Sequence, residues 1–382
     1  MDLNNVLAVA VKGGASDIHL KVGLPPMFRV NGSLLPLKDA ESLTAVAMAD
    51  TFAAIAPPHM QETLRTRLDC DFAHGVPGVG RFRVNAYLQR GTIGMVLRVI
   101  PFKIQTIDQL LLPPVAKKIA DNHRGLILVT GTTGSGKSTT LAALIDHINQ
   151  HRNGHIVTVE DPVEFLMRDK RSIISQREVG TDCLTFASAL RAALRQDPDV
   201  ILLGEMRDLE TIEIGLTAAE TGHLVLSTLH TADAAETITR LVTAFPPHMR
   251  AQVRMQLAGS LKAVISQRLV PRKDGKGRVA AVEVMVTTAR IRELILDETK
   301  FRELHEAIAK GQDTYGMQTF DQSLMSLLQQ GLITYDEALL QATHRDDFAL
   351  RVSGIEDGRP DWNAAPAPRK GGTPPAGTDF DF

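Results

Sequence analysis

The sequence contains little cysteine. Among 382 residues only Cys70 and Cys183 are present, and they do not form a CxxC pair. Structural zinc sites need several Cys or His ligands at close spacing, so we expect no thiolate zinc site. We also expect no disulfide, because the chain is expected to stay in a reducing compartment. Each cysteine is therefore interpreted as a small buried apolar residue.

Long apolar runs are lacking as well. A membrane-spanning helix needs about 20 consecutive apolar residues. The longest runs here, Leu126 to Val129 and Val200 to Leu203, have the length of buried strands. The N-terminus, Met1 to Asn5, lacks the basic start and the apolar core of a signal peptide. These absences predict a cytoplasmic protein without a membrane segment of its own.

Neither sign of charge is in excess. The 42 Lys and Arg residues nearly balance the 44 Asp and Glu residues, and the formal net charge is −2. A dedicated nucleic-acid binder normally shows a basic excess or a basic stripe, so we expect no direct nucleic-acid binding. A DNA-translocating ring would need a local basic pore. The candidates for such a pore are Lys262, Arg268, Arg272 and Lys273.

The first hundred residues predict a small α+β domain. Asn31-Gly32 lies between two short apolar runs, which predicts a β-hairpin because tight hairpin turns need positive φ angles. Alternating side chains predict strands at 81–87 and 94–100. Proline residues follow at 101, 113 and 114, so the segment 101–113 is interpreted as a hinge linker.

The remainder predicts a larger α/β domain and a tail. Between 114 and 353, short apolar runs alternate with segments of helical periodicity. This pattern favours a largely parallel sheet that is covered by helices on both faces. Residues 354–382 are rich in Pro, Gly, Ala and Asp and show no periodicity, so they are interpreted as a disordered tail.

A Gly-rich loop predicts a nucleotide site. It matches G-x-x-x-x-G-K-[ST], follows an apolar strand and precedes an amphipathic helix. In such loops the backbone N–H groups face the phosphates, the lysine, here Lys137, reaches the outer phosphates, and the hydroxyl, here Ser138, binds Mg²⁺. We therefore expect ATP with magnesium. The expected nucleotide-binding residues are Gly131, Thr132, Thr133, Gly134, Ser135, Gly136, Lys137, Ser138 and Thr139.

Acidic residues follow two further apolar runs. Glu205 ends the run that begins at Val200, where P-loop NTPases place an acid that organises Mg²⁺. The segment Glu160 to Glu164 follows the apolar run 156–159, and a carboxylate there could orient or deprotonate the attacking water. His223 and His230 flank the apolar run 224–229. Taken singly, each histidine indicates a structural role more than a catalytic one.

Four motifs, in their order along the chain, resemble those of the secretion-ATPase superfamily. They are GTTGSGKST at 131–139, EDPVE at 160–164, the run ending in Gly204-Glu205, and TGHLVLSTLHT at 221–231. Within that superfamily the chain most resembles the type IV pilus retraction (twitching motility) ATPases of the PilT family. The stretches that carry this resemblance lie at 14–20, 80–85, 176–180 and 316–324. The resemblance covers about residues 5 to 350. One motif, associated in that family with coupling hydrolysis to retraction, differs: AIRNLIRE is replaced by RIRELILD at 290–297, which keeps Arg292.

The resemblance implies a RecA-like P-loop ATPase core that follows a small PAS-like α+β domain. It also implies a hexameric ATP-hydrolysing motor that retracts pili through an inner-membrane platform protein, at the cytoplasmic face of that membrane. Glu164 would act on the water. Glu205 would position Mg²⁺, partly through water, and His223 and His230 would sense the γ-phosphate. The candidate arginine fingers, on the N-terminal domain, are Arg81, Arg83 and Arg98.

Other functions are also compatible with the sequence. The motif change at 290–297 leaves an accessory retraction ATPase paralogue as an alternative. Pilus-extension and type II secretion ATPases usually carry a longer N-terminal region and a four-cysteine zinc insertion, and neither is found here. A different class would be an ATP-binding regulatory subunit of the ring with little turnover. The presence of Lys137, Glu164 and Glu205 argues against that class.

Overall fold

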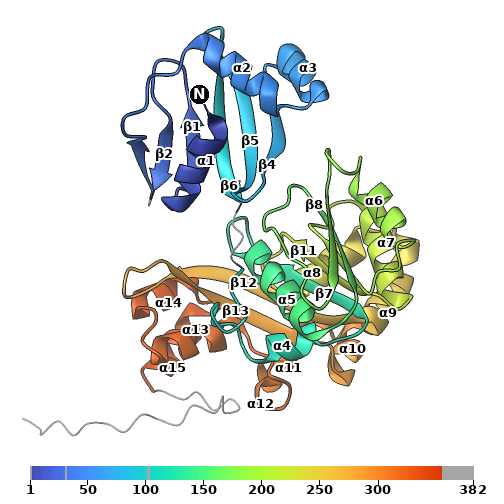
Figure 1. The fold of residues 1–382 in the computed structure, drawn as a ribbon. Coiled ribbons are helices and arrows are strands. Elements are labelled where there is room, and N and C mark those ends of the chain that lie inside the picture. The colour runs from blue at the N-terminus through green and yellow to red at the C-terminus, as the bar shows by residue number, and fades with distance from the viewer. Residues whose placement is uncertain (1, 31, 101–103, 355–382) are drawn as a thin grey trace, which may run out of the picture.

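The structure, a computed structural model, describes residues 2–30, 32–100 and 104–354. These residues form two folded units that follow one another along the chain (Figure 1). Asn31, Pro101 and the predicted tail, except Gly354, lie outside the described residues. In the described part of the chain no helix is long and apolar enough to cross a membrane.

The N-terminal unit is an antiparallel sheet with helices on one face, as the α+β prediction required. Its six strands lie in the order β3-β2-β1-β6-β5-β4. The predicted hairpin is confirmed, because Val30 pairs with Ser33 and Gly32 has a φ of +84°. The elements are α1 (Leu3–Lys12), β1 (Asp17–Leu20), β2 (Met27–Val30), β3 (Ser33–Pro36), α2 (Ala45–Ile55), α3 (Pro58–Arg67), β4 (Asp69–Val76), β5 (Gly80–Gln89) and β6 (Thr92–Ile100).

The alternation of β5 explains which face of this sheet is buried. Phe82 and Val84 point into the apolar cluster formed with α1, α2 and α3, and both are fully buried. Successive side chains of a strand point to opposite faces. Arg81 and Arg83 therefore project from the face that these helices leave uncovered, which makes that face polar.

The second unit has a seven-stranded sheet in the order β13-β12-β7-β11-β10-β8-β9. Every neighbouring pair is parallel except β12 and β13, so the predicted largely parallel sheet of a RecA-like core is confirmed. The strands are β7 (Gly125–Thr130), β8 (His155–Glu160), β9 (Ile173–Glu178), β10 (Val200–Leu203), β11 (Leu224–Leu229), β12 (Leu261–Pro271) and β13 (Arg278–Val286).

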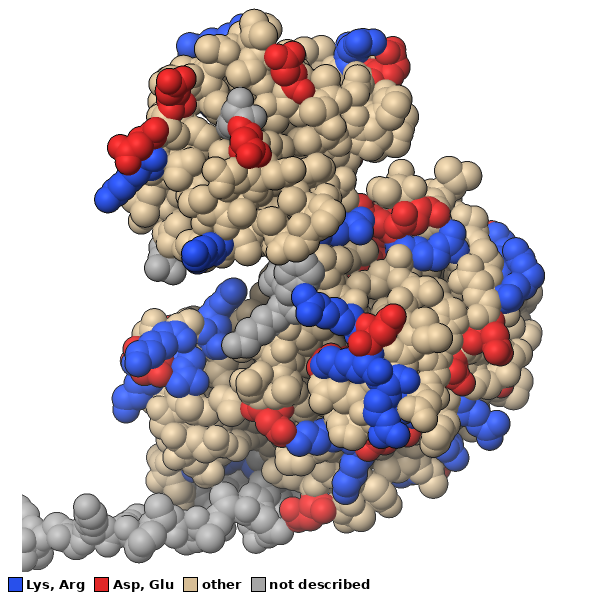
Figure 2. Space-filling view, viewed as in Figure 1, with Lys and Arg blue, Asp and Glu red and all other residues tan. Residues whose placement is uncertain are grey.

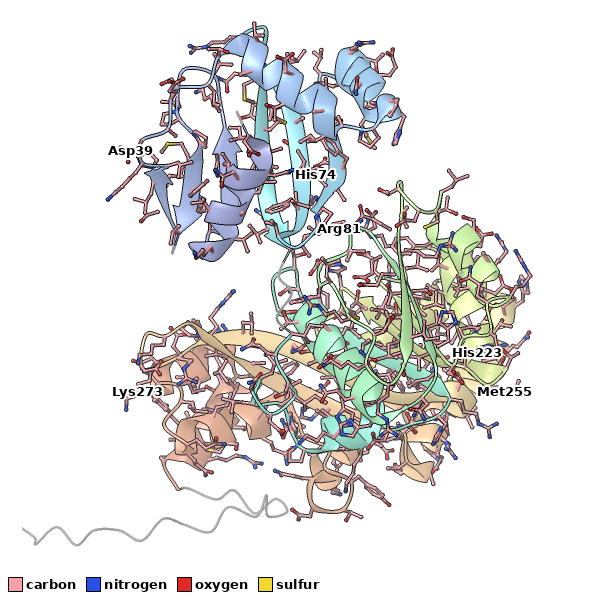
Figure 3. All side chains as sticks on the ribbon, viewed as in Figure 1. Asp39, His74, Arg81, His223, Met255 and Lys273 are labelled. Atoms are coloured by element: carbon pink, nitrogen blue, oxygen red, sulfur yellow. The ribbon has the colours of Figure 1, made fainter. Side chains whose placement is uncertain are left out.

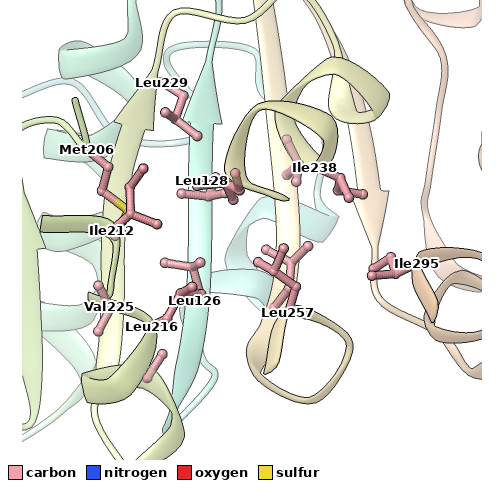
Figure 4. Packing of buried hydrophobic residues seen from close by; sticks show 14 of the residues in the cluster. Leu126, Leu128, Met206, Ile212, Leu216, Val225, Leu229, Ile238, Leu257 and Ile295 are labelled. Carbon is pink, nitrogen blue, oxygen red and sulfur yellow. The ribbon is translucent and has the colours of Figure 1, made fainter. Parts of the chain in front are cut away.

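Helices cover both faces of this sheet because its central strands are apolar on both sides. Leu126 and Leu128 pack with side chains of α7, α8 and α9 (Figure 4), whereas Ile127 and Val129 pack with α4 and α5. The helices are α4 (Val115–Ala120), α5 (Lys137–His151), α6 (Phe186–Ala193), α7 (Leu209–Glu220), α8 (Ala234–Thr243), α9 (Arg250–Ser260), α10 (Ala289–Leu296), α11 (Leu304–Lys310), α12 (Gln312–Tyr315), α13 (Phe320–Gln329), α14 (Tyr335–Gln341) and α15 (Arg345–Val352), with short 3-10 turns η1 (Pro247–Met249) and η2 (Phe301–Glu303).

Part of the predicted linker packs on the second unit. Ile107 and Leu112 are buried in the same apolar cluster as side chains of α4 and α5. Their burial fixes this part of the chain to the core of the second unit. A hinge within 101–113, which stays a prediction, would therefore lie before Ile107.

Candidate functional site

The Gly-rich loop lies where strand β7 ends, at the carboxyl edge of the parallel strands. Gly131, Gly134 and Gly136 all have positive φ angles, which other residues adopt at a steric cost. At Gly131 an added Cβ atom would lie 2.5 Å from the Gln267 carbonyl oxygen and 2.6 Å from Ser135 Oγ. The loop can therefore curl only with glycine at this position.

Helix α5 begins directly after the loop and carries Lys137 at its first position. The Lys137 side chain is buried, and its Nζ donates to the carbonyl oxygens of Gly131 (2.9 Å) and Thr132 (3.0 Å). Burial lowers the pKa of Lys137, while the charges of Glu205 and Glu164 partly oppose that shift. The lysine is thus held at the loop, within electrostatic reach of both predicted acids.

The loop also contains a hydroxyl that lacks a partner. Ser135 Oγ, which can donate to a phosphate oxygen, is buried without a hydrogen bond among the described residues. A buried polar atom left unpaired costs about 1–3 kcal/mol. Ser138 and Thr139 lie half-buried in the first turn of α5, whose N-terminus is a favourable place for an anion. The local chemistry therefore fits a phosphate group.

Glu205 and His230 meet at the same edge. Glu205 follows β10, and its carboxylate pairs with Arg207 (Nη2 to Oε2, 2.8 Å) and lies 3.6 Å from His230 Nε2. Burial opposes ionisation of Glu205, but the hydrogen bond and the charge of Arg207, with those of His230, bring its pKa below the usual value. The Glu205 carboxylate is therefore ionised at neutral pH, and its negative charge can attract a cation.

Thr228 holds the turn that carries Glu205, a role that sequence reasoning missed. Its Oγ1 donates to the Gly204 carbonyl (2.6 Å), and its own carbonyl accepts from the Met206 N–H (3.2 Å). Thr228 lies inside the histidine box at 221–231, so its motif membership was the available signal. Its structural purpose follows only from the pairing of β10 with β11.

The two glutamates of the acidic box differ in exposure. Glu160 is buried at the end of β8, where its Oε1 accepts from Thr158 Oγ1 (2.7 Å) and Gln176 Nε2 (3.1 Å). Burial raises the pKa of Glu160, and these hydrogen bonds only partly offset the increase. Glu164 is exposed to solvent, while its backbone N–H donates to Glu160 Oε2 (3.4 Å). Glu160 thus supports the segment, and Glu164 is the acid that can reach a water molecule.

His223 is not brought to this site. In the parallel register Leu229 lies opposite Thr130, next to the loop, but Leu224 lies opposite Gly125 at the other edge of the sheet. His223 precedes Leu224, and a strand rises about 3.3 Å per residue, so the six residues from His223 to Leu229 put the histidine roughly 20 Å from the loop edge. Its Nδ1 instead lies 3.0 Å from the Ala218 carbonyl, at the end of α7.

The three candidate arginine fingers are engaged by carboxylates of their own chain. Arg81 pairs with Glu178 of the second unit (3.1 Å), and Figure 3 shows Arg81 on the side of the N-terminal unit that faces this second unit. The other two pair within the N-terminal unit, Arg98 with Asp17 (2.8 Å) and Arg83 more weakly with Asp71 (3.9 Å). None of these pairs places a guanidinium on the phosphate loop of the same chain.

The four cations considered for a basic pore are not gathered in one place. Lys262 and Lys273 lie near opposite ends of β12, Arg268 stacks on the Phe320 ring (3.9 Å to the centroid), and Arg272 pairs with Asp274. In Figure 2 blue and red side chains are interspersed over the visible face, apart from a mostly blue group at one side of the second unit. A basic pore within one chain is therefore not formed by these four residues.

The chain is similar to known proteins over most of its length. A family model described as type II/IV secretion system protein matches residues 1–340. The type IV pilus retraction ATPase PilT of Pseudomonas aeruginosa is 48% identical, over 91% of this chain and 100% of its own length. The type IV pilus ATPase PilU of the same organism is 41% identical, over 92% and 91% respectively. A crystal structure of the pilus retraction motor PilT with bound ADP superposes with a TM-score of 0.83 at 44% identity, covering 91% of this chain and 98% of that one.

Proposed function

Because the chain belongs to the type II/IV secretion system protein family, we propose that it is an ATP-hydrolysing motor that retracts type IV pili. The observation that carries the proposal is the meeting of a phosphate loop, an ionised acid and a histidine at one edge of the sheet. The similarity to PilT extends over that relative's full length, so it includes both folded units. A likeness confined to the phosphate loop would support only nucleotide binding.

The residues at this edge support each part of ATP hydrolysis. The phosphates would lie on the loop, with Lys137 and the α5 N-terminus facing them. Mg²⁺, when bound, would neutralise phosphate charge and would be held by Ser138 and, partly through water, by Glu205. Glu164, the exposed acid, would orient or deprotonate the attacking water. His230, beside Glu205, would respond to the γ-phosphate.

Magnesium would be held mainly by the nucleotide. Among the described residues, no group of three or more His, Cys, Asp or Glu side chains could hold a metal ion. Mg²⁺ typically binds through one or two protein oxygens, several waters and substrate phosphates. The presence of one hydroxyl and one carboxylate at the loop suits that mode.

Phosphoryl transfer is also helped by an arginine at the γ-phosphate, and none of the three candidate arginines lies at the phosphate loop of its own chain. In a ring, a neighbouring subunit can supply this arginine. We propose a homo-hexamer in which the polar face of the N-terminal sheet meets the nucleotide site of a neighbouring subunit. Arg83 and Arg98 lie on that face and have exposed side chains. An arginine finger supplied in this way is worth about 10³–10⁵ in turnover. The ring would act at the cytoplasmic face of the inner membrane, through the platform protein of the pilus.

An accessory retraction role is the second candidate, and helix α10 is the reason. Arg292 is exposed there, but Arg290 pairs with Glu293 (2.8 Å) and Glu303, and Leu296 is exposed. In the family motif the corresponding positions differ, so the surface that this helix offers to a partner is changed. The phosphate site itself is unaffected by this change.

Pilus retraction in cells tests the proposal. The gene would be expressed in a type IV piliated strain that lacks its own retraction ATPases, beside Lys137→Ala and Glu164→Gln variants. We expect the wild type to restore retraction of labelled pili and both variants to fail. Restoration only when a principal retraction ATPase is also present would assign the accessory role. Binding of ATP without turnover by the purified wild type would instead assign a regulatory subunit.

A further inference from the structure

One carboxylate joins the two folded units to the acidic box. Glu178 is the last residue of β9, the edge strand of the seven-stranded sheet. Its Oε2 accepts a hydrogen bond from Arg81 Nη2 of the N-terminal unit (3.1 Å). The same Oε2 atom accepts from the backbone N–H of Val163 (3.1 Å). Since Val163 directly precedes Glu164, one hydrogen bond to Val163 and the peptide bond that follows it connect Glu178 to the proposed catalytic acid.

Glu178 is held firmly on its own side. Its side chain is 6% exposed, and its Oε1 accepts from Thr181 Oγ1 (3.3 Å). Its backbone N–H donates to Asp182 Oδ2 (2.9 Å). A buried carboxylate that loses its cationic partner is destabilised, because the remaining charge is left in a poorly solvated place. A change at Arg81 is therefore expected to shift the Glu178 carboxylate and, with it, the Val163 N–H that this carboxylate binds.

The acidic box depends on two carboxylates for its backbone position. Glu160 accepts from the N–H of Glu164, and Glu178 accepts from the N–H of Val163. Glu160 is itself fixed by Thr158 and Gln176, which both belong to the same sheet. Of the two supports, Glu178 is the one that forms a hydrogen bond with the other folded unit among the described residues. It is the support through which movement of the N-terminal unit can reach Glu164.

The contact made by Arg81 has room to change. Nη2 makes the bond to Glu178, whereas Nε is buried without a hydrogen bond among the described residues. A guanidinium that offers two N–H groups to both carboxylate oxygens binds more strongly than one that offers a single group. A small rotation of the N-terminal unit could therefore strengthen or break this pairing.

We propose that Glu178 is a positioning residue that couples the orientation of the N-terminal unit, sensed through Arg81, to the placement of Glu164. The proposal rests on the proposed ATPase function. It assigns Arg81 a role within its own chain, unlike the role of Arg83 or Arg98 as fingers for a neighbour. Domain movement and the readiness of the hydrolytic acid are then linked in each subunit.

A double-mutant cycle on the full chain tests this link. We would measure kcat and KM for ATP in the wild type, Arg81→Ala, Glu178→Gln and the double variant. Each single change is expected to lower kcat about tenfold with KM within about twofold, because the acid is displaced while the phosphate loop is intact. The double variant is expected to be no worse than either single one, since both break the same link. Arg67→Ala, an exposed change in α3, is the control and should match the wild type.

Mixed rings separate this role from a finger in trans. Protomers carrying Arg81→Ala would be combined with protomers carrying Glu164→Gln. If Arg81 acts within its chain, no active site regains both functions and turnover stays low. Recovered turnover would show that Arg81 serves a neighbour and would overturn the proposal, as would independent, multiplying effects in the double-mutant cycle.

Amide hydrogen exchange gives a readout that needs no turnover. Peptides covering 160–165 are expected to exchange faster in Arg81→Ala and Glu178→Gln than in the wild type or Arg67→Ala. Unchanged exchange would overturn the coupling even if the wild type hydrolyses ATP. A wild type that shows no turnover would count against the ATPase function, while exchange would still decide whether the link exists.

Discussion

The two ends of β11 carry the same residue type at opposite edges of one sheet. At the carboxyl edge His230 lies beside Glu205, and Lys137 is within reach of that same acid. At the amino edge His223 lies against the end of α7, and Lys262 faces the like charges of Arg292 and Arg124. Among the described residues, a lysine, an acid and a histidine gather beside the anion-accepting loop at the carboxyl edge, whereas the charges near Lys262 at the amino edge are alike. Ligands of open α/β sheets bind outside the carboxyl ends of the strands, and here the charge pattern follows that rule.

The largest expected effect is a difference in ATP turnover between variants of two lysines, Lys137 at the carboxyl edge and Lys262 at the amino edge. Lys137→Ala removes the cation from the phosphate loop, and turnover of ATP is expected to fall at least about a thousandfold. Lys262→Ala removes a cation from the amino edge and should leave turnover within about twofold. Steady-state phosphate release from both purified variants checks the pair. Equal losses would mean that the amino edge takes part in hydrolysis.

A second pair compares glutamates. Glu164→Gln keeps the shape of the side chain but removes the base, so kcat should fall roughly a hundredfold or more while ATP binding persists. Glu220→Gln, at the amino-edge end of α7, changes an exposed acid that pairs with Gln256 and should be near wild type. Single-turnover kinetics with a fluorescent ATP analogue separate binding from hydrolysis. Loss of binding in Glu164→Gln would instead assign the acid to the nucleotide pocket.

A pH-dependent effect on stability is expected from Glu283, the buried acid of β13. Glu283 pairs across the sheet with Ser266, which pairs with Thr130 of β7, and it accepts from the Ala234 N–H at the start of α8 (2.8 Å). The pKa of Glu283 rises from 4.5 to about 7, mainly because the side chain is buried. The Ala234 hydrogen bond and Arg268 lower this pKa, whereas Asp233 and Asp321 raise it.

Because the folded state binds this proton more tightly than the unfolded chain, stability is lost as pH rises from about 4.5 to 7. The loss is on the order of 3 kcal/mol when complete. Glu283→Gln should therefore be more stable than the wild type at pH 8 and close to it below about pH 4.5, as measured by urea unfolding. A difference of the same size at both pH values would show that charge is not the cause.

The smallest expected effect separates the two histidines. His230→Ala removes the partner beside Glu205 and should lower kcat about tenfold, equivalent to about 1.4 kcal/mol of barrier. His223→Ala should change kcat by less than twofold, because its ring lies at the other edge. Both variants would be assayed at saturating ATP. An equal or larger effect at His223 would show that ring assembly brings this residue to a nucleotide site.

Local patterns allowed much of this fold to be predicted. Asn-Gly at 31–32 indicated the hairpin, and the Gly-rich motif at 131–139 indicated a phosphate loop between a strand and a helix. These features depend on residues close in sequence. The predicted parallel sheet could also have placed His223, because a residue that precedes a parallel strand lies at the amino edge. The histidine box contains both His223 and His230, so the resemblance gave them the same role although they lie at opposite edges of the sheet.

Contacts between distant segments could not be predicted in this way. The partner of Arg81 is Glu178, 97 residues further on, and nothing local to either residue indicates it. Thr228 supports the Glu205 turn only because β11 lies next to β10. Ile107 and Leu112 look like linker residues until their burial beside α4 and α5 is seen.

Hydrogen exchange with and without a non-hydrolysable ATP analogue and Mg²⁺ tests the claim that one edge holds the nucleotide. We predict slower exchange in peptides covering 131–139, 160–165 and 204–207, at the carboxyl edge. Peptides covering 121–125 and 221–223, at the amino edge, should exchange as before. Protection confined to the amino edge, or no protection of the phosphate loop, would contradict the account.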